Sequence, residues 1–261
     1  MDLNLKNKVF IVTGGSKGIG EGISRAIAAE GGYIVIATRS AGPVTDNLVD
    51  EFKKNGTEAH AIIGDLQTTE NCQRVITETV NKFGRIDGIV NNAGINDGAG
   101  LEKGPEAFRQ SLQRNLFHYY DLVHFALPYL KKTKGSIVNI SSKVALTGQG
   151  GTSGYAAAKG AQLALTREWA AELLPYSIRV NAVLPAEVMT PLYQKWLQNS
   201  FEDPQAKEQE IVSKIPLEKR MTTKEEMANM VVFLLSDKSS HTTGQFMIVD
   251  GGYTHLDRAL T

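Results

Sequence analysis

A tyrosine and a lysine four residues apart, Tyr155 and Lys159, have the types and the spacing needed for acid–base chemistry. Residues at this separation share one face of an α-helix, and Thr152 and Ser153 are good N-cap residues for a helix that begins near Gly154. A lysine ammonium beside a phenol favours the phenolate and lowers the phenol pKa from its usual value of about 10. Of the 8 tyrosines, only Tyr155 has a lysine at this spacing. The pair is predicted to act as a general acid and base near neutral pH, the alternative being two unrelated surface residues.

A glycine-rich stretch follows the apolar run Val9–Thr13 and precedes a helical pattern that ends near Glu30. Its glycines, Gly14, Gly18 and Gly20, are spaced G-x-x-x-G-x-G and not in the commoner G-x-G-x-x-G order. Glycine at these points lets the backbone turn tightly, approach a pyrophosphate and pack the helix on the sheet, with the phosphates at the helix N-terminus. A strand, this turn and a helix predict a dinucleotide site, although a glycine-rich loop without that role is the alternative.

The end of the second predicted strand, Tyr33–Thr38, indicates which coenzyme is used. An acidic residue at this place holds the ribose of NAD, whereas an arginine accommodates the extra phosphate of NADP. Here the next residue is Arg39, and Lys17 adds a second cation, so NADP is the predicted coenzyme and NAD the alternative. Asp65, after the third predicted strand Ala59–Ile63, could accept a hydrogen bond from the adenine amine or could simply stabilise a turn.

The remaining strands and helices alternate along the chain. Further strands are predicted at Ile86–Val90, Gly135–Ser141, Ser177–Leu184 and Gln245–Val249, and further helices at Asp46–Lys54, Thr68–Phe83, Pro105–Lys131 (with a break or kink at Pro128) and Thr223–Leu235. The charged helical pattern Leu192–Lys214 lacks a strong apolar stripe and predicts a substrate lid over about residues 191–214. This alternation predicts one α/β domain, residues 1–261, built on a parallel sheet.

Composition excludes several classes of protein. The 28 basic and 28 acidic residues balance in a chain of 261, so no binding to nucleic acid or to an anionic membrane is expected. The single cysteine, Cys72, cannot form an internal disulfide, and neither a secretory signal nor a run of about 20 apolar residues is present. The five histidines have no metal-binding spacing, so no metal is predicted. We expect a cytoplasmic enzyme.

These features together resemble the short-chain dehydrogenase/reductase family over essentially the whole chain. Besides the glycine loop, the stretch Asn91–Gly94 matches the motif after the family's fourth strand, and Thr190 matches the threonine that holds the nicotinamide carboxamide. The catalytic tetrad of the family is matched in order and spacing by Asn115, Ser142, Tyr155 and Lys159. One departure is Pro185-Ala186, where the family commonly has Pro-Gly, and we expect this change to tilt the loop without abolishing coenzyme binding.

The resemblance implies a Rossmann fold with a doubly wound, seven-stranded parallel sheet and helices on both faces. It also implies that Tyr155 transfers the proton, Lys159 lowers the Tyr155 pKa and binds the nicotinamide ribose, Ser142 binds the substrate oxygen, and Asn115 orders a water that connects Lys159 to bulk solvent. The implied coenzyme site consists of Gly14, Ser16, Lys17, Gly18, Ile19, Gly20, Arg39, Asp65, Leu66, Asn91, Ala93, Gly94, Tyr155, Lys159, Pro185, Val188 and Thr190.

A narrower similarity concerns the substrate. The stretches Asn96-Asp97, Thr147–Gln149, Pro185–Tyr193 and Val249–Thr261 are similar to a subgroup of the family that oxidises C1 of free sugars to lactones, which makes L-fucose the expected substrate. The predicted substrate residues are Asn96, Ser142, Gln149, Tyr155 and Glu187. The alternatives are a reductase of a ketoacyl thioester or of a keto sugar acid or uronate and, in a different class, a catalytically silent nicotinamide-binding sensor.

Two helical segments predict self-association. The segments Pro105–Lys131 and Gly154–Leu174 carry apolar residues on more than one face, among them Phe117, Tyr120, Leu165 and Trp169. A helix that is apolar all round is buried, here against a symmetry mate. Together with the family resemblance, this predicts a homotetramer.

Overall fold

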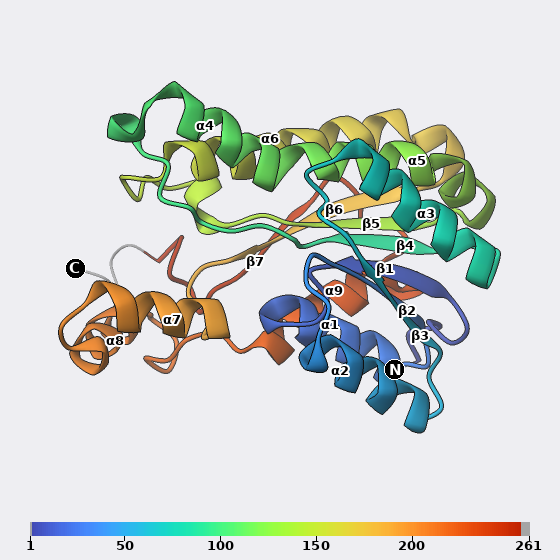
Figure 1. Cartoon of the computed structure of the whole chain (residues 1–261), viewed down its shortest axis with the longest axis horizontal. Helices are drawn as coiled ribbons and strands as arrows, with labels where there is room; N and C mark the ends of the chain where they lie inside the picture. Colours follow the sequence, from blue (N-terminus) through green and yellow to red (C-terminus); the bar gives the residue numbers. More distant parts are fainter. Residues whose placement is uncertain (1, 257–261) are drawn as a thin grey trace.

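Seven parallel strands form one sheet in the order β3-β2-β1-β4-β5-β6-β7 in this computed structural model, which describes residues 2–256 (Figure 1). The strands are β1 (Val9–Thr13), β2 (Tyr33–Thr38), β3 (Ala59–Ile63), β4 (Gly88–Asn91), β5 (Ser136–Ile140), β6 (Arg179–Pro185) and β7 (Phe246–Val249). Continuous apolar runs form these strands because both faces of a parallel sheet are covered. The predicted seven-stranded parallel sheet is confirmed.

Helices cover both faces of the sheet, as predicted. Figure 1 shows α1, α2 and α9 on one face and α3 to α6 on the other, with α7 and α8 at one end. Their bounds are α1 Gly18–Ala29, α2 Pro43–Lys54, α3 Thr69–Phe83, α4 Gly104–Leu112, α5 His118–Thr133, α6 Ser153–Glu172, α7 Pro191–Ser200, α8 Pro204–Ser213 and α9 Lys224–Leu235. Single 3-10 turns lie at Leu101–Lys103, Lys143–Ala145, Leu174–Tyr176 and Asp237–Ser239. Each face of the sheet therefore has its own apolar core.

The first and the last α-helices pack against each other although almost the whole chain separates them. Ile23 and Ile27 of α1 share one buried core with Met227 and Val231 of α9. The backbones approach closely, since a Cβ added at Gly22 would lie 2.7 Å from the carbonyl oxygen of Lys224. A glycine in the middle of α1 thus permits the contact that closes one face of the sheet.

The long helix predicted over Pro105–Lys131 is interrupted. A wide π-helical turn, Gln113–Phe117, separates α4 from α5. The helix does not end at Pro128, where a break or kink was expected, but continues to Thr133. An interior proline removes one backbone hydrogen bond and its ring crowds the carbonyl of residue i−4, but the buried side chains of α5 on both sides of Pro128, such as Ala126 and Leu130, keep the last turn helical.

The predicted lid consists of two helices and not one. Thr190 caps α7 by accepting a hydrogen bond from the Tyr193 backbone N–H at 3.1 Å. Asp203, the last residue before α8, caps this helix because its side chain accepts hydrogen bonds from the backbone N–H groups of Gln205 and Ala206. Pro204 occupies the first helical position. Whether this pair of helices moves over the substrate remains a prediction.

Within residues 2–256, no helix combines the length and the apolar character needed to cross a bilayer. The last five residues of the C-terminal stretch Val249–Thr261, which contributed to the narrower resemblance, lie outside the described residues.

Candidate active site

The strand order reverses between β1 and β4, and in open parallel sheets such a reversal marks a crevice at the carboxyl ends of the strands. The chain leaves β1 toward β2 on one side and reaches β4 on the other, and ligands of open parallel sheets bind where the order reverses in this way. Thr13 joins the two strand ends, because its hydroxyl accepts bonds from the backbone N–H groups of Asn92 (2.8 Å) and Ala93 (2.9 Å). The glycine loop and the Asn91–Gly94 motif therefore lie side by side.

The glycine loop has the backbone that its sequence requires. Gly14 and Gly18 have φ of 63° and 56°, in the left-handed region where side chains are strained. At Gly20 an added Cβ would collide with the carbonyl oxygen of Gly14 and lie 2.6 Å from the Asn92 amide nitrogen. No side chain caps the N-terminus of α1, so its first backbone N–H groups are available to an anion. These features fit the pyrophosphate of a dinucleotide.

The predicted determinants of the coenzyme's adenosine half lie at the same edge of the sheet. Lys17 and Arg39 are exposed, while Ser16 is buried with its hydroxyl 3.4 Å from that of Thr38. Asp65 does stabilise a turn, since its carboxylate accepts bonds from the Gln67 backbone and side chain. Its role toward adenine therefore stays a prediction.

The remaining predicted coenzyme residues surround the crevice. A Cβ added at Gly18 would lie 3.2 Å from the Thr190 side chain, which brings the β6–α7 connection next to the glycine loop. Val188 is buried and bridges to Thr222, and Pro185 ends β6 in register with Val249. Ile19 lies in the first turn of α1, and Leu66, Asn91, Ala93 and Gly94 lie on the adjoining loops and strand ends.

The side chains of the predicted tetrad come from the connection after β5, from α6 and from the π-helical turn. Ser142 follows β5 and is 8% exposed. Lys159 is 3% exposed, and its Nζ donates to the Ile140 carbonyl oxygen at 2.7 Å and lies 5.5 Å from the Tyr155 ring centroid. Asn115 is fully buried. The face of α6 that carries Tyr155 and Lys159, which their i, i+4 spacing predicts to be shared, thus points into the protein.

The electrostatics of Tyr155 and Lys159 differ from the sequence-based expectation. Burial raises the pKa of Tyr155 to about 12, with a hydrogen bond from Ser142 acting in the opposite direction. Burial also lowers the pKa of Lys159 to about 7. The predicted lowering of the tyrosine pKa by an ammonium is therefore wrong for the protein alone, because desolvation disfavours both charged forms more than their proximity favours them.

Asn115 connects the loop after β4 to α6. Its Oδ1 accepts a bond from the Ile95 backbone N–H at 2.7 Å, and its Nδ2 donates to the Ser111 carbonyl oxygen at 2.9 Å. Its own backbone oxygen accepts a 2.6 Å bond from Gln162 Nε2. Gln162 is not among the site residues predicted from the sequence. Its position three residues after Lys159, on the same face of the helix, is a signal that could have indicated it.

Of the three further substrate residues predicted, only Glu187 belongs to a polar cluster near Ser142. Glu187 is paired with Lys143, the residue after Ser142, and accepts a 2.6 Å bond from the Tyr193 hydroxyl. Lys143 also lies 4.1 Å from the Tyr253 ring centroid. No sequence spacing links these residues, so Lys143 and Tyr193 were not predicted.

The other two predicted substrate residues are not brought into that cluster. Asn96 is exposed and accepts a bond from the Gly98 backbone N–H at 3.3 Å, which makes it a local turn residue. Gln149 is exposed on the loop before α6. Any contact of these two residues with a substrate remains a prediction.

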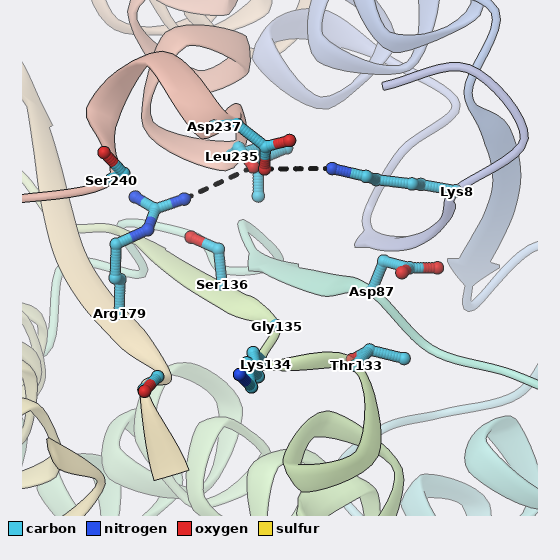
Figure 2. A pocket seen from close by; sticks show the side chains of 11 residues that line it. Lys8, Asp87, Thr133, Lys134, Gly135, Ser136, Arg179, Leu235, Asp237 and Ser240 are labelled. Carbon is cyan, nitrogen blue, oxygen red and sulfur yellow. Dashed lines mark hydrogen bonds and ion pairs between the residues drawn. The ribbon is translucent and has the colours of Figure 1, made fainter. Parts of the chain in front are cut away.

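A separate cavity of about 240 Å³ opens at the amino ends of the strands, on the edge opposite the glycine loop (Figure 2). Arg179 in its wall donates to the carbonyl oxygens of Leu234 (2.7 Å) and Ser236 (3.0 Å) at the end of α9. Lys8 is paired with Asp237 at 3.0 Å. Arg179 thus caps the C-terminal end of α9, and Lys8 joins the start of β1 to the residues that follow α9. These structural roles explain why both cations line the cavity. Among residues 2–256 no group of metal-ligating side chains gathers.

Comparisons with known proteins agree with this geometry. Residues 14–254 match the family model described as enoyl-(acyl carrier protein) reductase. The chain is 36% identical to L-fucose dehydrogenase of Bos taurus, over 97% of this chain and 91% of that protein. It is 34% identical to the 3-oxoacyl-(acyl-carrier-protein) reductase FabG of Thermotoga maritima, over 96% and 99% of the two chains. The crystal structure of Cj0485 dehydrogenase superposes with a TM-score of 0.95 at 49% identity, covering 100% and 99% of the chains.

Proposed function

Because the chain belongs to the short-chain dehydrogenase/reductase family, we propose that it oxidises the C1 hydroxyl of a free sugar, with L-fucose as substrate and L-fuconolactone as product. The observation that carries the substrate class is the cluster of Lys143, Glu187 and Tyr193 next to Ser142. A lipid chain would desolvate these groups without giving them new partners, whereas sugar hydroxyls can donate to and accept from them. The similarity to L-fucose dehydrogenases supports the same substrate.

The chemistry is divided between the protein and a nicotinamide coenzyme. The glycine loop and the α1 N-terminus would hold the pyrophosphate, and Thr190 and Lys159 the nicotinamide half. A bound nicotinamide would supply the acceptor for the hydride that leaves C1. Ser142 binds the C1 oxygen, and Tyr155 as phenolate takes the hydroxyl proton, so that the C1–O bond becomes the lactone carbonyl.

The coenzyme is proposed to be NADP in preference to NAD. Lys17 and Arg39 are exposed where the extra phosphate would lie, and a charge-assisted hydrogen bond contributes about 1.5–3 kcal/mol, equivalent to roughly tenfold or more in affinity. We therefore expect kcat/KM for NADP to exceed that for NAD by about tenfold, and Arg39→Gln to remove most of this ratio. Arg109→Gln, which changes a side chain that is 73% exposed on α4, is the matched control. Equal values with the two coenzymes, or an unchanged ratio in Arg39→Gln, would show that Arg39 is merely solvated.

The substrate class is tested by a panel of L-fucose, D-arabinose, L-galactose, a uronate and a ketoacyl thioester. We expect L-fucose to have the highest kcat/KM. Glu187→Ala and Gln149→Ala should each lower it by roughly tenfold, mainly through the KM of the sugar and not of NADP, since a hydroxyl loses its partner. Glu106→Ala removes a carboxylate that is 71% exposed on α4 and should leave the value unchanged.

A ketoacyl thioester reductase is the second candidate, because FabG proteins are nearly as similar to this chain as the sugar dehydrogenases are. If the thioester exceeds every sugar by tenfold or more, the substrate class is refuted while the roles of Tyr155 and Lys159 stand.

A homotetramer is proposed as the assembly. Phe117, at the end of the π-helical turn, and Tyr120, in the first turn of α5, are 45% and 54% exposed, which leaves apolar surface for a second copy. Trp169 does not contribute as predicted, because it is buried in the chain's own core, against which Leu165 also packs. The mass in solution, measured by light scattering, tests this assembly.

The buried single Cys72 is compatible with the proposed cytoplasmic location.

A further inference from the structure

Three side chains follow one another along the buried face of α6. Tyr155, Lys159 and Gln162 are spaced i, i+4 and i+7, and Gln162 is 0% exposed. Both polar atoms of the Gln162 amide are hydrogen-bonded. Oε1 accepts from Lys159 Nζ at 3.3 Å, and Nε2 donates to the Asn115 carbonyl oxygen at 2.6 Å. An ammonium can only donate and a carbonyl can only accept, so the two partners fix the orientation of the amide.

The Asn115 carbonyl is available because of the π-helical turn. In a π turn the backbone bonds run from i to i+5, so the regular ladder of the helix is displaced by one residue and a carbonyl can be left for another donor. The turn spans Gln113–Phe117 and has Asn115 at its centre. Gln162 therefore links Lys159 directly to the Asn115 carbonyl. The water predicted to connect Lys159 to bulk solvent remains a prediction.

The groups around Lys159 Nζ are uncharged acceptors. Nζ donates to the Ile140 carbonyl oxygen (2.7 Å), and at longer distances to Gln162 (3.3 Å) and to the Tyr119 hydroxyl (3.4 Å). The titratable neighbours are Tyr119 and Tyr155, together with the buried His118, whose pKa burial lowers to about 4 with a smaller contribution from Lys159.

The carboxylates near Lys159 influence its titratable neighbours, Tyr155 and His118, and not Lys159 itself. Burial dominates the pKa shifts of Tyr155 and His118, and the charges of Asp97 and Asp65 raise these two pKa values by smaller amounts. Within residues 2–256 no carboxylate is paired with Lys159. Neutral acceptors must therefore stabilise its charge.

We propose that Gln162 is a positioning residue that holds the Lys159 ammonium in its charged form and ties it to the Asn115 carbonyl. This inference rests on the proposed roles of Tyr155 and Lys159, but not on which sugar is the substrate. Loss of the Gln162 acceptor makes the ammonium less stable, so the pKa of Lys159 falls and less positive charge supports the Tyr155 phenolate. The acid limb of the oxidation profile, which reports deprotonation of Tyr155, then moves to higher pH.

The direct test is a ¹³C NMR titration of Lys159 in the protein alone, labelled at lysine side chains. Gln162→Met keeps the volume of the side chain but removes the amide, and it should lower the pKa of Lys159 by roughly half a unit or more. Gln162→Asn keeps an amide that is one methylene too short to reach both partners, and it should give an intermediate pKa. Gln73→Leu, on the exposed face of α3, is the control and should match the wild type. A Lys159 pKa that is the same in all variants would overturn the proposal.

The kinetic test uses the best substrate of the panel with NADP. In Gln162→Met we expect kcat to fall by roughly tenfold with little change in KM, and the acid limb of kcat to move up by about half a pH unit. A loss of kcat without any movement of the limb would indicate a merely structural role and refute the proposal. Tyr155→Phe is measured in parallel: if it stays active, the proposed catalytic roles fail, and if it is inactive while the Gln162 profiles match wild type, only the role of Gln162 fails.

Discussion

Tyr155→Phe is expected to lower kcat for sugar oxidation by about 10²–10⁴-fold, the usual contribution of a general base. The hydroxyl that is removed is the group assigned to take the C1 proton, and the phenyl ring that remains keeps the packing of α6. Because burial raises the pKa of Tyr155 to about 12, the wild-type rate of oxidation should also rise as the pH is increased through the neutral range. The measurement is kcat with saturating sugar and NADP from about pH 6 to 10.

The control for this variant is Tyr176→Phe, which removes the hydroxyl of a tyrosine that is 40% exposed on a distant 3-10 turn. It should keep wild-type turnover. NADP affinity and the thermal midpoint should be unchanged in both variants, since neither hydroxyl carries the fold. Turnover within threefold of wild type in Tyr155→Phe would remove Tyr155 from the mechanism.

Gly20→Ala is expected to be the most damaging small substitution in the coenzyme loop. The added methyl group would collide with the Gly14 carbonyl oxygen and lie 2.6 Å from the Asn92 amide, which itself donates to the Thr13 carbonyl oxygen at 2.8 Å. Backbone cannot yield as a flexible side chain can, so overpacking should cost about 1–3 kcal/mol of folding free energy. A displacement of about 1 Å in the groups that orient a ligand costs roughly 10²-fold in rate, and we expect that loss in kcat/KM for NADP.

Gly148→Ala provides the matched control for Gly20→Ala. A Cβ at Gly148 meets nothing within 4 Å, and its φ is outside the left-handed region. Its thermal midpoint and its kcat/KM for NADP should equal those of wild type, whereas Gly20→Ala should melt several degrees lower. If Gly20→Ala binds NADP as tightly as wild type does, the close packing of the glycine loop on β4 is not needed for the site.

The sequence predicted the strands better than it predicted the interruptions in the helices. The bounds of β2 and β3 agree with the apolar runs Tyr33–Thr38 and Ala59–Ile63, because burial on both faces leaves a continuous signal in the sequence. The π turn around Asn115 has no such signal. Its extra residue is stabilised by Ile95 and Gln162, which are remote in the sequence.

The same reason limits what could be predicted about the site. Tyr155 and Lys159 are near neighbours along one helix, so their spacing indicated their common face. The pairing of Lys143 with Glu187 joins two connections that follow different strands, β5 and β6, and only the sheet brings them together. The spacing with Lys159 predicts a lowered pKa for Tyr155, whereas burial raises it. Desolvation depends on every side chain packed around the ring, and no spacing along the sequence reveals that packing.

The packing of α1 against α9 has a consequence for the order of events during synthesis. The ribosome makes α1 among the first segments and α9 only after most of the chain has emerged, on the order of ten seconds or more later. Until then Ile23 and Ile27 lack their partners Met227 and Val231, and one face of the nascent sheet stays open to water. A polypeptide released before Lys224 would therefore carry exposed apolar surface, which makes premature termination products targets for chaperones and proteases.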